Sequence, residues 1–159
     1  MQGHTMQGHS ERFAQAVAHA LRWLRYRDYS SQELEQRLQR RGYTAEEIEE
    51  TLAWLRAEGY LSDERLAARL IERYTAEQPS GQRRIEQIFT QRGLAVPALE
   101  EDEETRAVRA LQQRFGEPPP TADPRQVARW FRFLLQRGFE AETAQSALRR
   151  WNPHIKEEL

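Results

Sequence analysis

The chain has 159 residues, with 24 basic and 25 acidic side chains, a net charge of −1 and no cysteine. The absence of cysteine excludes disulfides, thiolate metal sites and cysteine nucleophiles. No run of eighteen apolar residues is present, so the sequence predicts no transmembrane helix. The polar beginning of the chain also lacks the apolar core of a secretion signal. We therefore expect a cytoplasmic protein.

The charges are segregated along the chain. Residues 11–43 carry seven arginines against four acids, residues 44–104 carry seven against fifteen, and residues 105–151 carry nine against four. Basic ends around an acidic middle suit a partner of mixed charge, such as a nucleoprotein, better than a bare duplex. Of the 24 basic residues 23 are arginine. A codon bias of the genome explains this preference at least as well as phosphate recognition does.

Residues 1–10 double the phrase Met-Gln-Gly-His, and we interpret them as a disordered lead-in or an artificial leader outside the fold. The first predicted repeat spans residues 11–61 and begins with a helix over about residues 11–27. In that helix apolar side chains recur at three- and four-residue spacing, from Phe13 to Leu24.

Two further helices complete the first repeat. Ser30-x-x-Glu33 and Thr44-x-x-Glu47 are typical capping boxes, in which each side chain satisfies a free N–H group of a helix start. The second helix is expected to end before Gly42, because glycine readily adopts the left-handed conformation that closes a helix.

The second predicted repeat spans residues 62–101. Its first helix covers about residues 63–77, and a turn containing Gly81 leads into a helix that ends at Arg92. Pro97 suits the first position of a third, short helix, which then runs into the acidic residues 100–104.

The third predicted repeat spans residues 102–151. Its first helix ends near Phe115, and a stiff proline-rich loop follows. Asp123-Pro124 predicts the start of the next helix, which ends before Gly138, and a last helix runs to Trp151. We expect a flexible tail over residues 152–159. The pattern thus predicts an all-α protein with nine helices in three triplets.

The three repeats share one helix ending, an arginine followed by a glycine, at Arg41-Gly42, Arg92-Gly93 and Arg137-Gly138. The three glycines lie 51 and 45 residues apart. An arginine there complements the partial negative charge of a helix C-terminus, and this structural role is sufficient to explain it. We therefore do not count these three arginines among the candidate binding residues. A chain of such repeats offers a long surface for a partner.

The parts of a catalytic or metal site are missing from the sequence. His4 and His9 lie in the lead-in, His154 lies in the tail, and His19 falls on the polar side of its helix, where we expect it to be exposed. The acidic residues 100–104 lack the spacing of a calcium loop, and we interpret them as a solvated helix start. We expect no enzyme, no metal and no cofactor.

Some arginines have no such structural explanation, and these are the candidate partner- or DNA-binding residues. Arg83-Arg84 stands at a helix start, where the helix dipole disfavours cations. Arg149-Arg150 precedes a tryptophan, and a third group shares one helix with Trp130 and Phe133. The full set is Arg25, Arg27, Arg83, Arg84, Arg125, Arg129, Arg132, Arg149 and Arg150. Binding and plain solubility explain them about equally well.

Three aromatic residues fall outside the inward helix faces. Phe133 is left over when the buried stripe of its helix is filled, and we expect it to pack against a neighbouring repeat. Tyr26 and Tyr29 lie next to arginines, which suggests base stacking. Their position at a helix end favours packing instead.

Several phrases resemble the RecX family, the regulators of the RecA recombinase. They include Tyr29-Ser30-x-x-Glu33-Leu34, Arg41-Gly42-Tyr43 and the longer Glu58-Gly59-Tyr60-Leu61-Ser62-Asp63-Glu64-Arg65. Gly81-x-Arg83-Arg84-Ile85 and Leu134-Leu135-x-Arg137-Gly138-Phe139 extend the resemblance into the second and third repeats. The chain departs from the family after Gly93, where the expected helix is short and strongly acidic.

The resemblance implies three tandem three-helix repeats in an elongated, curved array. It also implies binding in the groove of the RecA–single-stranded DNA filament, where the protein bridges neighbouring protomers. Loss of RecA ATPase and strand-exchange activity and disassembly of the filament would follow. We expect a monomer that makes weak direct contact with DNA and none with membranes. The alternative is a general helical protein that binds nucleic acid directly, because paired helices can present one helix to a groove.

Overall fold

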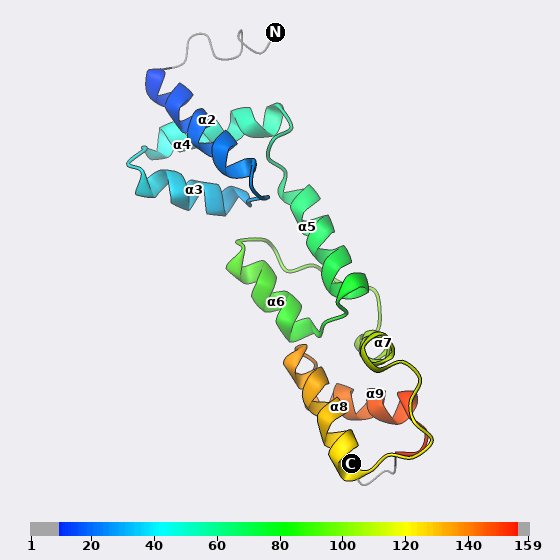
Figure 1. Ribbon diagram of the computed structural model, residues 1–159. Coiled ribbons are helices and arrows are strands. Elements are labelled where there is room, and N and C mark those ends of the chain that lie inside the picture. Colours follow the sequence, from blue (N-terminus) through cyan, green and yellow to red (C-terminus); the bar gives the residue numbers. More distant parts are fainter. Residues whose placement is uncertain (1–9, 156–159) are drawn as a thin grey trace. The chain divides into compact units, whose positions relative to one another are not determined.

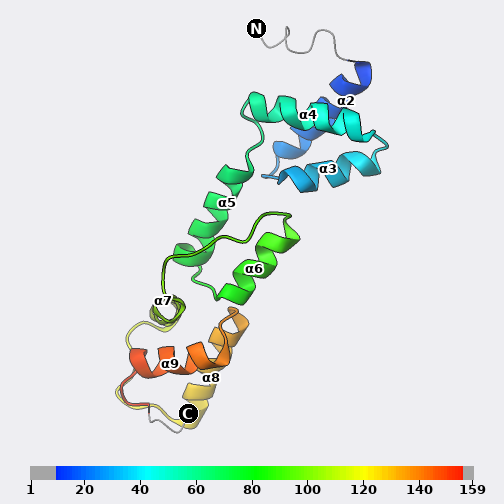
Figure 2. The same ribbon diagram turned by 180° about the vertical axis from the view of Figure 1, so that it is seen from behind.

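The computed structural model describes residues 10–155, and this part of the chain is entirely helical (Figures 1 and 2). It contains eight α-helices and one π-helical turn, with no β-strand among the described residues. The elements are α2 (Glu11–Leu24), α3 (Ser31–Arg40), α4 (Ala45–Ala57), α5 (Asp63–Glu72), η1 (Arg73–Glu77), α6 (Gln82–Gln91), α7 (Glu103–Phe115), α8 (Pro124–Gln136) and α9 (Ala141–Trp151). The predicted all-α fold is confirmed.

The contacts divide the chain into two compact units. Unit 1 comprises the residues up to Ala68 together with Gln91–Leu94, and unit 2 comprises Arg69–Thr90 together with the residues from Ala95 onward. The middle one of the three predicted repeats therefore contributes residues to both units. Each unit is described separately below.

Unit 1 is built on three helices, α2, α3 and α4, each of which packs against the other two. Both predicted capping boxes are present: Ser30 and Glu33 start α3, and Thr44 and Glu47 start α4. The first helix ends at Leu24, three residues earlier than expected. The core consists of small and aliphatic residues with two tyrosines: Ala16, Ala20, Tyr29, Leu34, Leu38, Tyr43, Ile48, Leu52, Leu55 and Leu61.

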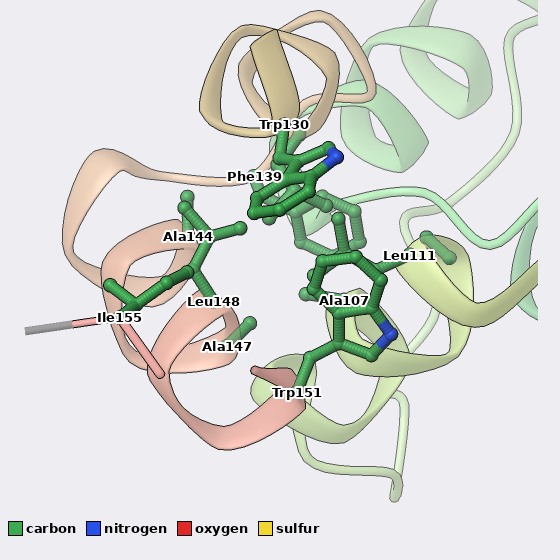
Figure 3. Close-up of a cluster of buried hydrophobic side chains, with 11 residues drawn as sticks. Ala107, Leu111, Trp130, Phe139, Ala144, Ala147, Leu148, Trp151 and Ile155 are labelled. Atoms are coloured by element: carbon green, nitrogen blue, oxygen red, sulfur yellow. The ribbon is translucent and has the colours of Figure 1, made fainter. Parts of the chain in front are cut away.

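Unit 2 repeats this plan with α7, α8 and α9. Its core joins Ala107 and Leu111 of α7 to Trp130 of α8 and to Leu148 and Trp151 of α9 (Figure 3). The rings of Trp130 and Trp151 meet edge to face with their centroids 4.9 Å apart. Small residues on α7 and α9 allow these two helices to pack closely around the large rings.

The helix predicted at Pro97 does not form, so the expected count of nine helices is wrong for the described residues. Asp102 caps α7 by accepting a hydrogen bond from the N–H group of Thr105. Glu101 lies just outside α7 and forms a double hydrogen bond with Arg109, at 2.6 and 2.8 Å. These contacts compete with a helix that would run from Pro97 through the acidic residues, where like charges repel.

Two further expectations change in detail. The last part of the predicted helix 63–77 is the π-helical turn η1, where the hydroxyl of Thr75 donates to the carbonyl of Ile71. In the predicted tail 152–159, Asn152 is fully buried and Ile155 joins the core of unit 2. Within residues 10–155, no helix combines the length and hydrophobicity that crossing a membrane requires.

Candidate partner-binding surface

In unit 1, Arg92-Gly93 does more than end a helix. The Arg92 guanidinium donates to the carbonyl of Asp28 at 3.0 Å and to the carboxylate of Glu33 at 2.8 Å. In return, the hydroxyl of Ser30 donates to the carbonyl of Arg92. The start of α3 is therefore held against the residues that follow α6 by three hydrogen bonds. Burial opposes ionisation of Glu33, but its bonds to Arg92 and to the Ser30 N–H group outweigh that and hold its pKa below the usual value.

Unit 2 contains the same type of junction at Arg137-Gly138. The Arg137 guanidinium donates to the carbonyl of Pro79 at 3.0 Å, and the N–H group of Gly81 donates to the carbonyl of Arg137 at 2.8 Å. A Cβ atom on Gly138 would lie 2.4 Å from the Cβ of Arg84, so the end of α8 and the start of α6 are in direct contact. A short helix-start loop thus packs on an Arg-Gly ending in each unit.

The remaining Arg-Gly ending, Arg41-Gly42, differs from the other two. Gly42 has positive φ like Gly93 and Gly138, but no described atom lies within 4 Å of a Cβ atom placed on it. The side chain of Arg41 is exposed. The sequence predicts only a helix-ending role for Arg92 and Arg137, and the structure adds loop binding to that role. Arg41 contacts no helix-start loop among the described residues, so loop binding does not explain it.

Three arginines on and around α3, of which Arg27 and Arg41 are exposed and Arg37 is half-buried, form a continuous stack with two aromatic rings, which we name the arginine–aromatic stack. It comprises, in order, Arg27, Tyr29, Arg37, Trp23 and Arg41. The guanidinium carbons of Arg27 and Arg37 lie 4.0 and 4.9 Å from the centroid of Tyr29. Those of Arg37 and Arg41 lie 5.2 and 5.7 Å from the centroid of Trp23. All of these distances fall within the range of a cation–π interaction.

Most arginines around this stack have no acidic partner. Within residues 10–155, no carboxylate oxygen lies within the 4.0 Å of a salt bridge from Arg22, Arg25, Arg37, Arg40 or Arg41. The excess of glutamates in this part of the chain lies on α4 instead. The surface therefore combines unneutralised cations with one buried ring, Tyr29, and one half-buried ring, Trp23, a combination suited to an anionic partner.

His19 belongs to this surface and is not fully exposed as expected. Its ring is half-buried and stacks on Trp23, with the centroids 5.9 Å apart. Burial lowers the pKa of His19, and the charges of Arg41 and Arg22 lower it further. The imidazole therefore stays neutral at pH 7 and acts as one more aromatic ring in the surface.

The two candidates in unit 1 lie at the edge of the stack. Arg27 is part of it and also lies 3.6 Å from the Glu33 carboxylate. Arg25 is exposed and helps to line a shallow surface hollow of about 470 Å³, together with Leu21, Leu24, Asp28, Tyr60 and Arg65. Tyr26 is 82% exposed, so the expectation that it packs is wrong, whereas Tyr29 is buried as expected.

The candidate arginines of unit 2 do not form one group, because their contacts differ. Arg83 lies 4.0 Å from Glu140 at the limit of an ion pair, and Arg150 bonds Glu104 and Thr105. Arg129 packs over Phe115, 5.3 Å from its centroid. Phe133 packs edge to face on the same ring, which belongs to its own predicted repeat and not to a neighbouring one as expected. Arg125, Arg132 and Arg149 have no described salt-bridge partner, and the first two are exposed. Arg84 lies in the Arg137 junction.

Sequence reasoning missed Arg37, Arg41 and Trp23 as parts of one surface. The four-residue spacing of Arg37 and Arg41 places them on one face of a helix, and this signal was available. Their alignment with Trp23 depends on how α3 packs against α2, which the helical pattern does not specify.

One buried arginine has a structural role. Arg106 is 1% exposed, and its Nε donates to the carbonyl of Ser80 at 2.6 Å. Burial lowers its pKa, and Glu101 at 3.7 Å counteracts that effect. No group of three metal-binding side chains exists among residues 10–155.

Three-helix units joined by Arg-Gly junctions define a class, the helical-repeat proteins. Comparison with protein-family models identifies two regions. Residues 16–55 match the first three-helix domain of RecX, and residues 101–148 match its third three-helix domain. The chain belongs to the RecX family.

Curated relatives agree over most of their length. The regulatory protein RecX of Leptothrix cholodnii is 37% identical over 137 residues, which cover 82% of this chain and 85% of the relative. That of Halorhodospira halophila is also 37% identical, covering 80% of this chain and 83% of the relative. The crystal structure of RecX from Lactobacillus salivarius has a TM-score of 0.65 at 16% identity, covering 87% of this chain and 96% of that one. The last comparison supports the fold alone.

Proposed function

We propose that this protein is a cytoplasmic regulator of the RecA recombinase that binds the RecA–single-stranded DNA filament. It binds as a monomer in the filament groove and bridges neighbouring protomers. It thereby inhibits ATP hydrolysis and strand exchange and promotes filament disassembly, without chemistry of its own. Membership of a family of regulatory proteins supports this proposal.

The structural observation that supports this proposal is the arginine–aromatic stack. A filament of protein and DNA presents phosphates, bases and acidic side chains together. Guanidinium groups bind phosphates and carboxylates, while aromatic rings stack on bases. The acidic α4 of the same unit suits basic protein surface. A partner with both signs of charge is therefore favoured over bare duplex.

The experiment titrates the protein into preformed filaments of the recombinase from the same genome. We expect ATP hydrolysis to fall and filaments to shorten in electron micrographs at amounts below one protein per recombinase protomer. The double variant Arg37→Glu, Arg41→Glu should require at least about tenfold more protein, because each exposed charge contact to a filament is reversed. The double variant Arg56→Glu, Arg65→Glu, at two exposed arginines of unit 1 outside the stack, serves as the charge-matched control. Unchanged hydrolysis and unchanged filament length at excess protein and low salt would overturn the proposal.

A second candidate, direct binding of nucleic acid without RecA, is favoured by the same stack. It predicts tight binding to a free oligonucleotide with a steep dependence on salt. Fluorescence anisotropy with labelled oligo(dT) separates the two. Weak binding to free DNA together with tight binding to filaments would reject this candidate.

A further inference from the structure

The two junctions join corresponding parts of the chain, an Arg-Gly ending and the residue before a helix, but they carry opposite charges at one position. In unit 1 the residue that donates to the arginine carbonyl is Ser30, and three residues later comes Glu33, whose carboxylate bonds Arg92. In unit 2 the corresponding donor is Gly81, and three residues later comes Arg84. The carboxylate that neutralises the first junction is thus replaced by a second cation in the other.

The cations of the second junction are unneutralised. The Cβ atom and backbone of Arg84 lie against Gly138, the residue that follows Arg137. The charge of Arg114 also acts on Arg137. Among residues 10–155, no carboxylate oxygen lies within the 4.0 Å of a salt bridge from Arg84, Arg114 or Arg137. Burial lowers the pKa of Arg137, and the charges of Arg84 and Arg114 lower it further.

Hydrogen-bonding capacity is also left over. The Nε atom of Arg84 is buried and has no acceptor among the described atoms. Arg137 donates from Nη1 to Pro79, whereas the equivalent Arg92 satisfies both a carbonyl and a carboxylate. A guanidinium has five N–H groups, and a buried donor without a partner is unfavourable. The junction therefore lacks both a negative charge and its oxygen atoms.

Aromatic rings hold the arginines of the second junction in place. Arg84 and Arg73 lie over Tyr74, at 5.7 and 5.3 Å from its centroid. Arg137 lies over Phe133 at 4.9 Å, and Arg114 lies over Phe115 at 5.3 Å. Such packing orients the guanidinium groups in advance, so that little rotamer freedom remains to be lost when an anion binds.

We propose that Arg84 and Arg137 form a binding site for a phosphate-class oxyanion. The anion takes the place that the Glu33 carboxylate occupies in the first junction and bonds the free guanidinium N–H groups of Arg84 and Arg137. Tetrahedral oxyanions match the planar fork of arginine and receive two N–H groups at once. The source of the anion is a phosphodiester of a nucleic-acid strand or free phosphate.

Thermal unfolding of the full chain tests the site without any recombinase. In sodium phosphate we expect the midpoint to exceed that in sodium chloride of equal ionic strength by about 3–5 °C at ten times Kd. Arg84→Glu should have a higher midpoint in chloride, because it recreates the carboxylate of the first junction, and should lose the phosphate effect. Arg83→Glu changes the charge equally on the exposed neighbouring side chain and should keep most of the effect. Arg84→Gln tests the loss of the cation without a new carboxylate.

The result that overturns the site is a phosphate effect that Arg84→Glu and Arg84→Gln both retain, or that Arg83→Glu loses to the same degree. A second measurement distinguishes the sources. If the anion is a phosphodiester, binding of labelled oligo(dT) should weaken at least about tenfold in Arg84→Gln, the loss of one charge-assisted contact. If oligo(dT) binding is unchanged while the phosphate effect is lost, the ligand is free phosphate, and the site stands.

Discussion

Replacing Gly138 by alanine, with the same change at Gly42 as its control, measures how much the second junction contributes to stability. The two glycines have nearly the same backbone conformation, with φ of 91° and 89°. An alanine in this left-handed region costs roughly 1–2 kcal/mol because its Cβ crowds the carbonyl group. At Gly42 that cost stands alone, because no described atom lies within 4 Å of the new Cβ.

At Gly138 a second cost is added. The new Cβ would lie 2.4 Å from the Cβ and 2.7 Å from the backbone nitrogen of Arg84, so the start of α6 must move. Overpacking of this kind adds about 1–3 kcal/mol. We expect Gly42→Ala to lower the free energy of unfolding by about 1–2 kcal/mol and Gly138→Ala by about 2–5 kcal/mol.

Urea unfolding followed by circular dichroism provides the two free energies and the m-values. Equal losses in the two variants would refute the reasoning, because the contact between Gly138 and Arg84 would then contribute nothing. A larger loss in Gly42→Ala would contradict it as directly.

Three further predictions concern single side chains. Ser30→Ala removes the α3 cap and the bond to the Arg92 carbonyl, and should lower the free energy of urea unfolding by about 1–3 kcal/mol; a loss within experimental error would contradict both roles. Leu111→Ala, at a fully buried core position of unit 2, should cost about 2–5 kcal/mol with an unchanged m-value, and a loss below 1 kcal/mol would argue against this core. Bonds from Arg12 and from the Thr44 N–H group lower the pKa of Glu47 from 4.5 to about 2. The stability it contributes is therefore present above pH 4.5 and lost as the pH falls toward 2. The difference in Tm between the natural chain and Glu47→Gln should be largest near pH 6 and fall to a small fraction of that value near pH 2; a difference independent of pH would show that the Glu47 charge is not responsible.

Local signals were sufficient to predict most helix starts. Ser30, Thr44 and Asp123 each accept a hydrogen bond from the N–H group three residues later, and the corresponding sequence is short and specific. The helix expected at Pro97 failed for a different reason. Glu101 bonds Arg109, eight residues away, and that contact depends on the position of the chain outside α7. The proline and the acidic residues, taken alone, do not reveal that this contact competes with helix formation.

The candidate surface was predicted less well than the fold. The bond between Arg92 and Asp28 joins residues 64 positions apart, so periodicity within one helix contains no information about it. Tyr26 and Tyr29 illustrate the same limit, because both follow the same helix, yet one is exposed and the other is buried. The number of arginines in each segment indicated where cations gather. Which aromatic rings they contact, and which of their N–H groups lack an acceptor, depends on packing between helices.

The junctions also bear on how such a chain can change its length in evolution. In each junction an Arg-Gly ending contacts a helix-start loop that precedes it in the sequence. The arginine donates to a backbone carbonyl of that loop, and its own carbonyl accepts from the residue before the helix, Ser30 or Gly81. The charge at the third residue of that helix differs between the two junctions. A duplicated repeat would bring both halves of this contact with it, an Arg-Gly ending and a loop to receive one. Gene duplication can therefore add a module without new complementary side chains, and the added copies can then diverge in charge independently. Family members with more than three repeats are the expected products of that process.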